Sequence, residues 1–294
     1  MVPLELAKLT ALMDRTSGSP DVKIGLIDGP VVTQHPDLVG EHLHEIPGNN
    51  GATCAQANSM ACLHGTFVAG ILTAKRSSPA PAICPNCTLL IRPIFAEKTT
   101  GSEQMPSATP LELAAAIIEC IEAGARVINL SLALAQPSTK GEQALEEALS
   151  QAVRRGVIVV AAAGNQGTLG SSAITRHPWV IPVVACNLQG RPMNESNLGS
   201  SIGRRGLSAP GDGITSLSAQ GQPLTLGGTS VAVPFVTGAI ALLWSEFPAA
   251  SAAQIKLAVT QAGAPRRASV VPPLLDAAAA FRVLSMANER RRTA

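Results

Sequence analysis

The chain has very few aromatic residues and no tyrosine. Aromatic residues make up 2% of its 294 residues, and charged residues 14%. Proteins that bind single-stranded nucleic acid stack bases on aromatic rings, and proteins that bind duplexes present a basic face. With a formal net charge of +2 as well, the composition supports neither nucleic acid nor an anionic membrane surface as a partner.

A long apolar run and a secretory signal are also missing. The most apolar stretch, residues 231–244, is shorter than the roughly 20 residues of a bilayer-spanning helix, and we interpret it as a buried core helix. Residues 1–20 lack the basic start, apolar centre and cleavage site of a signal peptide. We therefore expect a cytoplasmic protein without a membrane partner.

Helix-like and strand-like segments alternate along most of the chain. Strands separated by helices pair in parallel, so the pattern predicts an α/β fold, a mostly parallel twisted sheet with helices on both faces. The strand-like segments are 22–28, 88–94, 126–131, 157–162 and 180–185. The helix-like segments are 109–124, 141–155, 229–246, 251–262 and 273–287.

The domain organisation predicted from this pattern is simple. Residues 1–287 are predicted to form one domain, which starts with an N-terminal helix and lead-in over residues 1–20. A frayed basic tail, 288–294, is predicted to follow it. A chain of this length buries about three quarters of its unfolded surface without metals or disulfides. Segments 40–62, 75–86 and 96–108 are rich in loop-forming residues and are predicted to be loops.

Three short motifs carry the groups needed for nucleophilic catalysis. Asp28 ends an apolar strand-like run, His64 opens the helix-like segment HGTFVAG, and Ser230 follows GGT at the start of the long apolar helix. A serine hydroxyl becomes a nucleophile when an imidazole takes its proton and a carboxylate orients that imidazole. Sites of α/β proteins lie at the carboxyl ends of strands, where Asp28 would emerge. We predict that Asp28, His64 and Ser230 form a catalytic triad.

Together with further segments, these motifs resemble the subtilisin-like serine peptidases, or subtilases. The similarity runs from about residue 20 to about residue 262, and the order Asp, His, Ser is the known order of this family. The resemblance implies a three-layer subtilisin-like fold and hydrolysis of peptide bonds. The matching segments are GSPDVKIGLIDG (18–29), HPDL (35–38), HGTFVAG (64–70), VINLSLA (127–133), VIVVAAAGN (157–165), LSAPGDGI (207–214) and GGTSVAVP (227–234).

The resemblance also implies roles for residues outside the triad. Asn165 matches the residue whose side-chain amide donates to the oxyanion of the tetrahedral intermediate. Two segments of small residues match the strand edge that pairs with an extended substrate and one wall of the pocket before the scissile bond. The substrate-binding residues implied in this way are Leu130, Ser131, Leu132, Ala133, Ala162, Ala163 and Gly164.

Some positions depart from the family pattern. Gly29 and Pro30 follow the aspartate where the family usually has Ser or Thr and then Gly. Val231 and Val233 replace the usual Met and a small residue. None of these changes removes a reacting group, so we still expect an active enzyme with a reshaped site floor.

Cysteines and metals leave alternatives open. The six cysteines are Cys54, Cys62, Cys84, Cys87, Cys120 and Cys186. The last two lie in apolar contexts typical of buried thiols. For the others, local disulfides (Cys54 with Cys62, Cys84 with Cys87), free thiols and a zinc site remain possible interpretations. The family resemblance supplies no zinc, and Asp37 lacks the oxygen-rich turn that would complete a calcium site. We therefore expect no metal and no cofactor.

A narrower resemblance suggests the substrate. The segments LIDGPV (26–31) and APAICPNCTLLIRPIFAE (80–97) are similar to the protease domains that mature cyanobactins and related ribosomal peptides. This implies a serine endopeptidase whose partner is a precursor peptide, with recognition elements in loops 40–62 and 96–108. A general degradative subtilase and a catalytically silent peptide-binding protein are the alternatives. The oligomeric state is left open.

Overall fold

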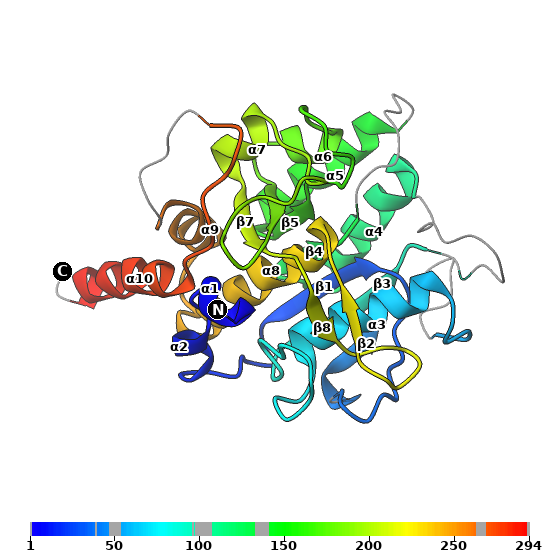
Figure 1. The fold of residues 1–294 in the computed structure, drawn as a ribbon. Coiled ribbons are helices and arrows are strands. Elements are labelled where there is room, and N and C mark those ends of the chain that lie inside the picture. The colour runs from blue at the N-terminus through cyan, green and yellow to red at the C-terminus, as the bar shows by residue number, and fades with distance from the viewer. Residues whose placement is uncertain are drawn as a thin grey trace.

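A computed structural model describes residues 2–38, 40–46, 54–95, 97, 108–132, 141–262 and 269–292. Of residues 291 and 292 it describes the backbone alone. Seven strands form one sheet in the order β2-β3-β1-β4-β5-β6-β7, and every neighbouring pair is parallel (Figure 1). The strands are β1 (Lys23–Asp28), β2 (Leu43–Glu45), β3 (Thr88–Pro93), β4 (Val127–Leu130), β5 (Ile158–Ala162), β6 (Ile181–Cys186) and β7 (Leu207–Pro210). The predicted parallel α/β fold is confirmed.

Helices cover both faces of this sheet. On one face α3 (Met60–Thr73) and α8 (Thr229–Glu246) share a buried apolar cluster with the strands, and on the other face α4 (Pro110–Glu122) and α5 (Glu142–Arg155) share a second cluster. The remaining elements are α1 (Pro3–Leu6), α2 (Thr10–Met13), η1 (Gly40–His42), α6 (Ala173–Arg176), α7 (Ser200–Arg205), α9 (Ala252–Gln261), α10 (Ala277–Arg292) and the hairpin β8 (Ile214–Ser216) with β9 (Leu224–Leu226).

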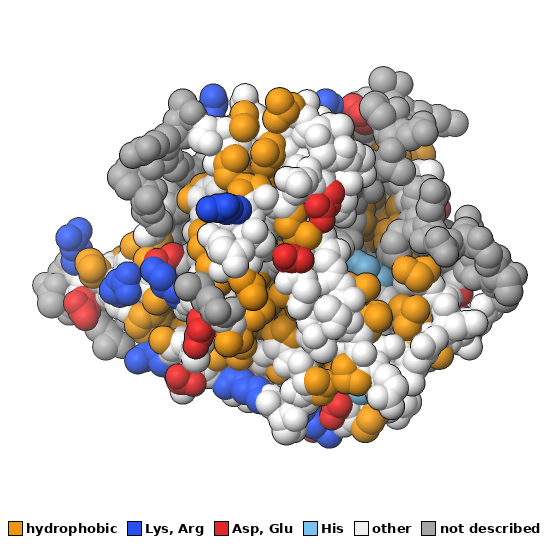
Figure 2. All heavy atoms as spheres, viewed as in Figure 1, with side chains coloured by type: hydrophobic (Ala, Val, Ile, Leu, Met, Phe, Trp, Pro, Cys, Tyr) orange, Lys and Arg blue, Asp and Glu red, His pale blue; other side chains and the backbone are white. Residues whose placement is uncertain are grey.

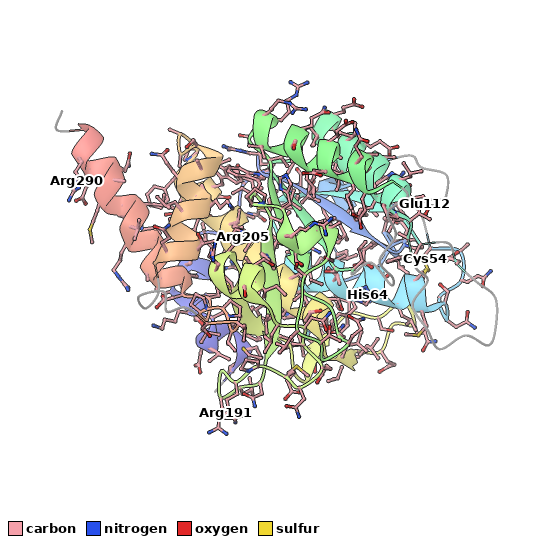
Figure 3. All side chains as sticks on the ribbon, turned by 90° about the horizontal axis from the view of Figure 1, so that it is seen from above. Cys54, His64, Glu112, Arg191, Arg205 and Arg290 are labelled. Carbon is pink, nitrogen blue, oxygen red and sulfur yellow. A yellow bond between two sulfur atoms is a disulfide. The ribbon has the colours of Figure 1, made fainter. Side chains whose placement is uncertain are left out.

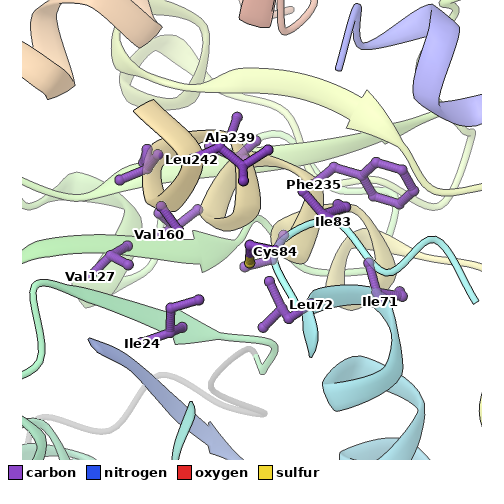
Figure 4. Packing of buried hydrophobic residues seen from close by; sticks show 14 of the residues in the cluster. Ile24, Ile71, Leu72, Ile83, Cys84, Val127, Val160, Phe235, Ala239 and Leu242 are labelled. Carbon is purple, nitrogen blue, oxygen red and sulfur yellow. The ribbon is translucent and has the colours of Figure 1, made fainter. Parts of the chain in front are cut away.

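The strands are apolar on both faces, as a sheet covered on both sides requires. In β1, Ile24 packs toward α8 and α3 while Ile27 packs toward α4. The close view in Figure 4 shows Val127 and Val160 of the sheet facing Ala239 and Leu242 of α8. With so few aromatic residues, the core consists mainly of Ala, Val, Leu and Ile.

Helix α8 occupies the centre of the molecule. It has the length and composition of a membrane span, and it is longer than the apolar run read from the sequence, but 83% of its 18-residue window is buried inside the protein. Its interpretation as a core helix is therefore confirmed. On the face drawn in Figure 2, basic and acidic side chains are interspersed, which agrees with the near-neutral composition.

Several local details differ from the sequence prediction. The N-terminal helix is broken in two, because Lys8 adopts a left-handed φ of 52° between α1 and α2. Helix α3 starts at Met60, ahead of His64, because Ser59 accepts the N–H of Cys62 as an N-cap. Strand β2 lies inside a segment that was predicted to be loop, and α10 continues to Arg292.

The structure distinguishes among the alternatives for the cysteines. Cys54 and Cys62 form a disulfide that closes the segment in front of α3, whereas the other four are buried free thiols. The interpretation of Cys84 and Cys87 as a disulfide is therefore wrong in this structure. Burial raises the pKa of the Cys120 thiol to about 12, so this group is an unreactive part of the core.

Candidate active site

The three predicted triad residues meet at the carboxyl edge of the sheet. Asp28 is the last residue of β1, His64 lies in the second turn of α3, and Ser230 lies in the first turn of α8. The Nδ1 atom of His64 is 2.7 Å from Oδ1 of Asp28, and its Nε2 atom is 3.1 Å from Oγ of Ser230. One hydrogen-bonded chain therefore joins carboxylate, imidazole and hydroxyl.

Close packing of two glycines brings α3 onto the turn after β1. A Cβ atom added to Gly29 would lie 2.0 Å from the carbonyl oxygen of Ala61, and one added to Gly65 would lie 2.4 Å from the carbonyl oxygen of Gly29. Any side chain at either position would push the helix away from the strand. Gly29, a departure from the family pattern, is thus required in this chain by the close approach of the Ala61 carbonyl group of α3.

The surroundings of Asp28 leave its charge only partly compensated. The carboxyl group is fully buried, and its Oδ1 atom accepts the N–H of Gly29 as well as the bond to His64. Its Oδ2 atom is buried without a hydrogen-bond partner among the described residues. The two residues that follow cannot supply a donor there, because Gly29 has no side chain and Pro30 has no N–H. His64 is therefore the main partner of this carboxylate.

The pKa of His64 reflects two opposing effects. Burial lowers the pKa, because it disfavours the charged imidazolium. The charge of Asp28 and its hydrogen bond raise the pKa, and together they outweigh burial, so the pKa lies above the usual 6.5. The imidazole is a stronger base than a solvent-exposed histidine and can accept a proton from the adjacent hydroxyl.

Asn165 follows β5 and reaches the start of α8. Its Oδ1 atom accepts the N–H of Thr229 at 2.9 Å and the hydroxyl of Thr229 at 3.0 Å, while that hydroxyl oxygen accepts the N–H of Gly164. Because Oδ1 takes both donors, Nδ2 faces away and can donate elsewhere. Gly228 adopts a φ of 119° directly beneath this amide. The sequence motif GGTS had not revealed this positioning role of Thr229.

The residues predicted to contact substrate share one edge of the sheet. Leu130 of β4 pairs in register with Ala161 of β5, so the two segments leave the sheet side by side. Leu130, Ser131, Leu132, Ala162, Ala163 and Gly164 are buried there, and Ala133 lies outside the described residues. Asn197, which the sequence did not point to, donates from Nδ2 to the carbonyl oxygen of Ala163 and so helps to hold this segment in place.

A carboxylate joins the segments before α3 and after β3. Glu97 accepts the backbone N–H groups of Ala55 and Gln56 at 3.0–3.1 Å. In Figure 3 the disulfide-bonded Cys54 lies next to the catalytic-site end of α3, which carries His64. Cys54, Cys62 and Glu97 place ligand-type atoms within 4.8 Å of one another. Because a disulfide offers no thiolates, this group is not a metal site in its oxidised form.

The family assignment rests on comparison with known protein families. The sequence model of the family described as the Subtilase family matches residues 19–276 of this chain. The chain belongs to the subtilase family. Subtilisin DY of Bacillus licheniformis is 31% identical over 241 residues, which are 80% of this chain and 81% of that protein. Subtilisin E of Bacillus subtilis (strain 168) is 30% identical over 256 residues, which are 85% of this chain but 62% of that protein.

Solved structures of subtilases have the same fold. A variant of the protease domain of PatA superposes with a TM-score of 0.81 at 30% identity, covering 92% of this chain and 97% of that domain. The prenylagaramide maturation protease PagA superposes with a TM-score of 0.80 at 28% identity, covering 94% and 98%. The predicted resemblance to subtilases, and to the cyanobactin type among them, is confirmed.

The charge balance around His64 can be measured directly. NMR titration of the imidazole signals should give His64 a pKa above 6.5 in the native chain. In Asp28→Asn the two effects that raise the pKa are removed and burial remains, so the pKa should fall below 6.5. His177, whose pKa is lowered by burial and which lies away from Asp28, provides an internal reference that should not move. A native His64 pKa below 6.5 would contradict this account.

Proposed function

We propose that this subtilase is a serine endopeptidase that uses Asp28, His64 and Ser230 as its catalytic triad. The observation that carries the proposal is the hydrogen-bonded chain from Asp28 through His64 to Ser230. Ser230 Oγ attacks the scissile carbonyl carbon while His64 Nε2 takes its proton. His64 then gives that proton to the leaving amine, and Asp28 stabilises the imidazolium in between.

Asn165 completes this mechanism as the oxyanion donor. Its Oδ1 atom is held by both donors of Thr229, the residue before Ser230, so its Nδ2 protons remain available to donate to a bound substrate. A donor fixed before the reaction stabilises the negative charge that develops on the carbonyl oxygen, without the cost of reorganisation. The substrate backbone would lie along the edge formed by Leu130–Ala133 and Ala162–Gly164, where small residues allow close approach.

For the substrate we propose a ribosomal precursor peptide. The similarity to PatA and to the maturation protease PagA covers nearly the whole of those structures. The bond from Glu97 to the backbone of Ala55 and Gln56 joins the two segments in which we expected recognition elements. The disulfide between Cys54 and Cys62 ties this junction to α3, which carries His64. Contacts at the junction would select a peptide by residues remote from the scissile bond.

A cytoplasmic location remains part of this proposal. The apolar helix α8 is a core element and provides no membrane anchor. We also keep the proposal of a single peptidase domain over residues 1–287, without a cofactor.

Labelling by a fluorophosphonate probe tests the nucleophile. The native chain should react covalently at Ser230, because His64 activates that hydroxyl, and should hydrolyse peptides. Ser230→Ala should lose both properties while it keeps the native thermal unfolding temperature. A matched control is Ser218→Ala, which removes a buried serine hydroxyl that accepts the N–H of Gln220 and should retain labelling. Unlabelled native protein would instead favour the silent peptide-binding alternative.

Replacement of Asn165 tests the oxyanion donor. Asn165→Ala should lower kcat by about 100-fold or more with little change in KM, because the donor acts only when charge develops. The size of this loss is that found when the oxyanion-hole asparagine is removed from subtilisin, a member of this family. Asn187→Ala, an amide removed from another surface turn, should have no effect on kcat. An unchanged kcat in Asn165→Ala would show that another group stabilises the oxyanion.

A peptide library separates the two enzyme alternatives. Cleavage products of a diverse synthetic library, identified by mass spectrometry, should show one narrow consensus if the chain processes a precursor peptide. Casein should then be cut slowly. Rapid digestion of casein and cleavage after many residue types would establish a degradative subtilase instead. The Ser230→Ala protein, run in parallel, removes the contribution of contaminating proteases.

A further inference from the structure

A chain of hydrogen bonds, buried except for its partly buried last bond, links the middle of α8 to the first turn of α8 through β4. The hydroxyl of Thr237 donates to Oδ1 of Asn129 at 2.9 Å, and Nδ2 of Asn129 donates to Oγ of Ser131 at 2.8 Å. The hydroxyl of Ser131 then donates to the carbonyl oxygen of Ser230, also at 2.8 Å. All four residues lie at the interface between β4 and α8, and every donor in the chain points toward Ser230.

The last acceptor in this chain lacks its ordinary helical partner. In an α-helix the carbonyl oxygen of residue i accepts the N–H of residue i+4. For Ser230 that residue is Pro234, which lies inside α8 and has no N–H. An unpaired buried carbonyl group is costly. The hydroxyl of Ser131 thus provides the hydrogen bond that proline removes, at the residue that carries the nucleophilic oxygen.

The surroundings show that this chain is not ordinary core packing. Asn129 and Thr237 are fully buried, and Ser131 is 2% exposed. Along β4 the same face of the sheet carries Val127, which belongs to the apolar cluster beneath α8. Apolar side chains of similar size would fill these positions without the cost of burying polar groups. When every group of a buried polar network is hydrogen-bonded, the network avoids the cost of unpaired groups and fixes one arrangement of the packed elements.

We propose that Thr237, Asn129 and Ser131 are positioning residues that hold Ser230 in line with His64. The proposal rests on the proposed function, since it assigns these residues to the same nucleophile. Thr237 lies about two turns from Ser230 on the same face of the helix. Bonds at both points fix the axial position of α8 against β4. They thereby keep the Oγ of Ser230 at hydrogen-bond distance from Nε2 of His64.

The first test changes Thr237, the residue of the hydrogen-bond chain farthest from Ser230, which is buried. Thr237→Val keeps the size of the side chain but removes the donor, and it should lower kcat about 10-fold with KM unchanged, as expected for a misaligned nucleophile. Thr237→Ser keeps the hydroxyl and should stay within about 2-fold of the native kcat. If Thr237→Val keeps the native kcat, the proposed positioning role is wrong.

The second test uses Pro234 in a double-mutant cycle. Ser131→Ala should lower kcat about 10-fold or more in the native background. In Pro234→Ala the helical N–H is restored, so Ser131→Ala should then cost less than about 3-fold. A matched control is Ser208→Ala, which removes a buried hydroxyl that donates to the carbonyl oxygen of Pro272. Its effect on kcat should be absent in both backgrounds.

A stability readout of the same cycle separates the two proposals. Ser131→Ala should lower the urea midpoint more in the native background than in Pro234→Ala, whether or not the protein is active. Additive midpoint changes would overturn the link between Ser131 and Pro234. A native chain that neither labels nor hydrolyses peptides would overturn the proposed function, while coupled midpoints would still support the hydrogen-bond chain.

Discussion

Burial of α8 against the parallel sheet is the interaction on which the rest of the structure depends. This helix contacts five of the seven strands, β1, β4, β5, β6 and β7, and also packs against α3 and α9, and 83% of its span is enclosed. Its burial supplies a large share of the apolar area that drives folding. Because Ser230 lies in its first turn, the same packing that stabilises the fold also determines the position of the Ser230 hydroxyl.

A buried helix brings a problem that the protein solves with polar groups. Apolar contacts are not directional, so they tolerate small shifts of a helix along a sheet, whereas hydrogen bonds fix the position of individual atoms. The bonds between Thr237, Asn129, Ser131 and Ser230 provide this directional element within the apolar layer. On the other side of the site, α3 is located by contact with the turn after β1, where Gly29 permits no side chain.

The electrostatics of the site follow from the same packing. Asp28 is taken out of water at the end of a central strand, and the next two residues provide a single backbone donor for its carboxylate. Its charge therefore acts mainly on His64, whose pKa rises despite burial. An imidazole of raised pKa next to a serine hydroxyl is the arrangement that proton transfer requires. Because Gly29 and Pro30 offer few hydrogen-bond donors to Asp28, more of the Asp28 charge is left to raise the pKa of His64.

Much of this protein could be predicted from its sequence, because local patterns determine local structure. Alternating apolar segments indicated the parallel sheet and its main helices, and the motifs around Asp28, His64 and Ser230 marked the chemistry. Which side chains bond to which was decided only by the tertiary structure. Thr237 and Asn129 lie far apart in the chain, as do Glu97 and Ala55, and nothing local to either residue of a pair records its partner. Hydrogen bonds need atoms placed within a few tenths of an ångström, and only the complete packing of the helices on the sheet sets distances that finely.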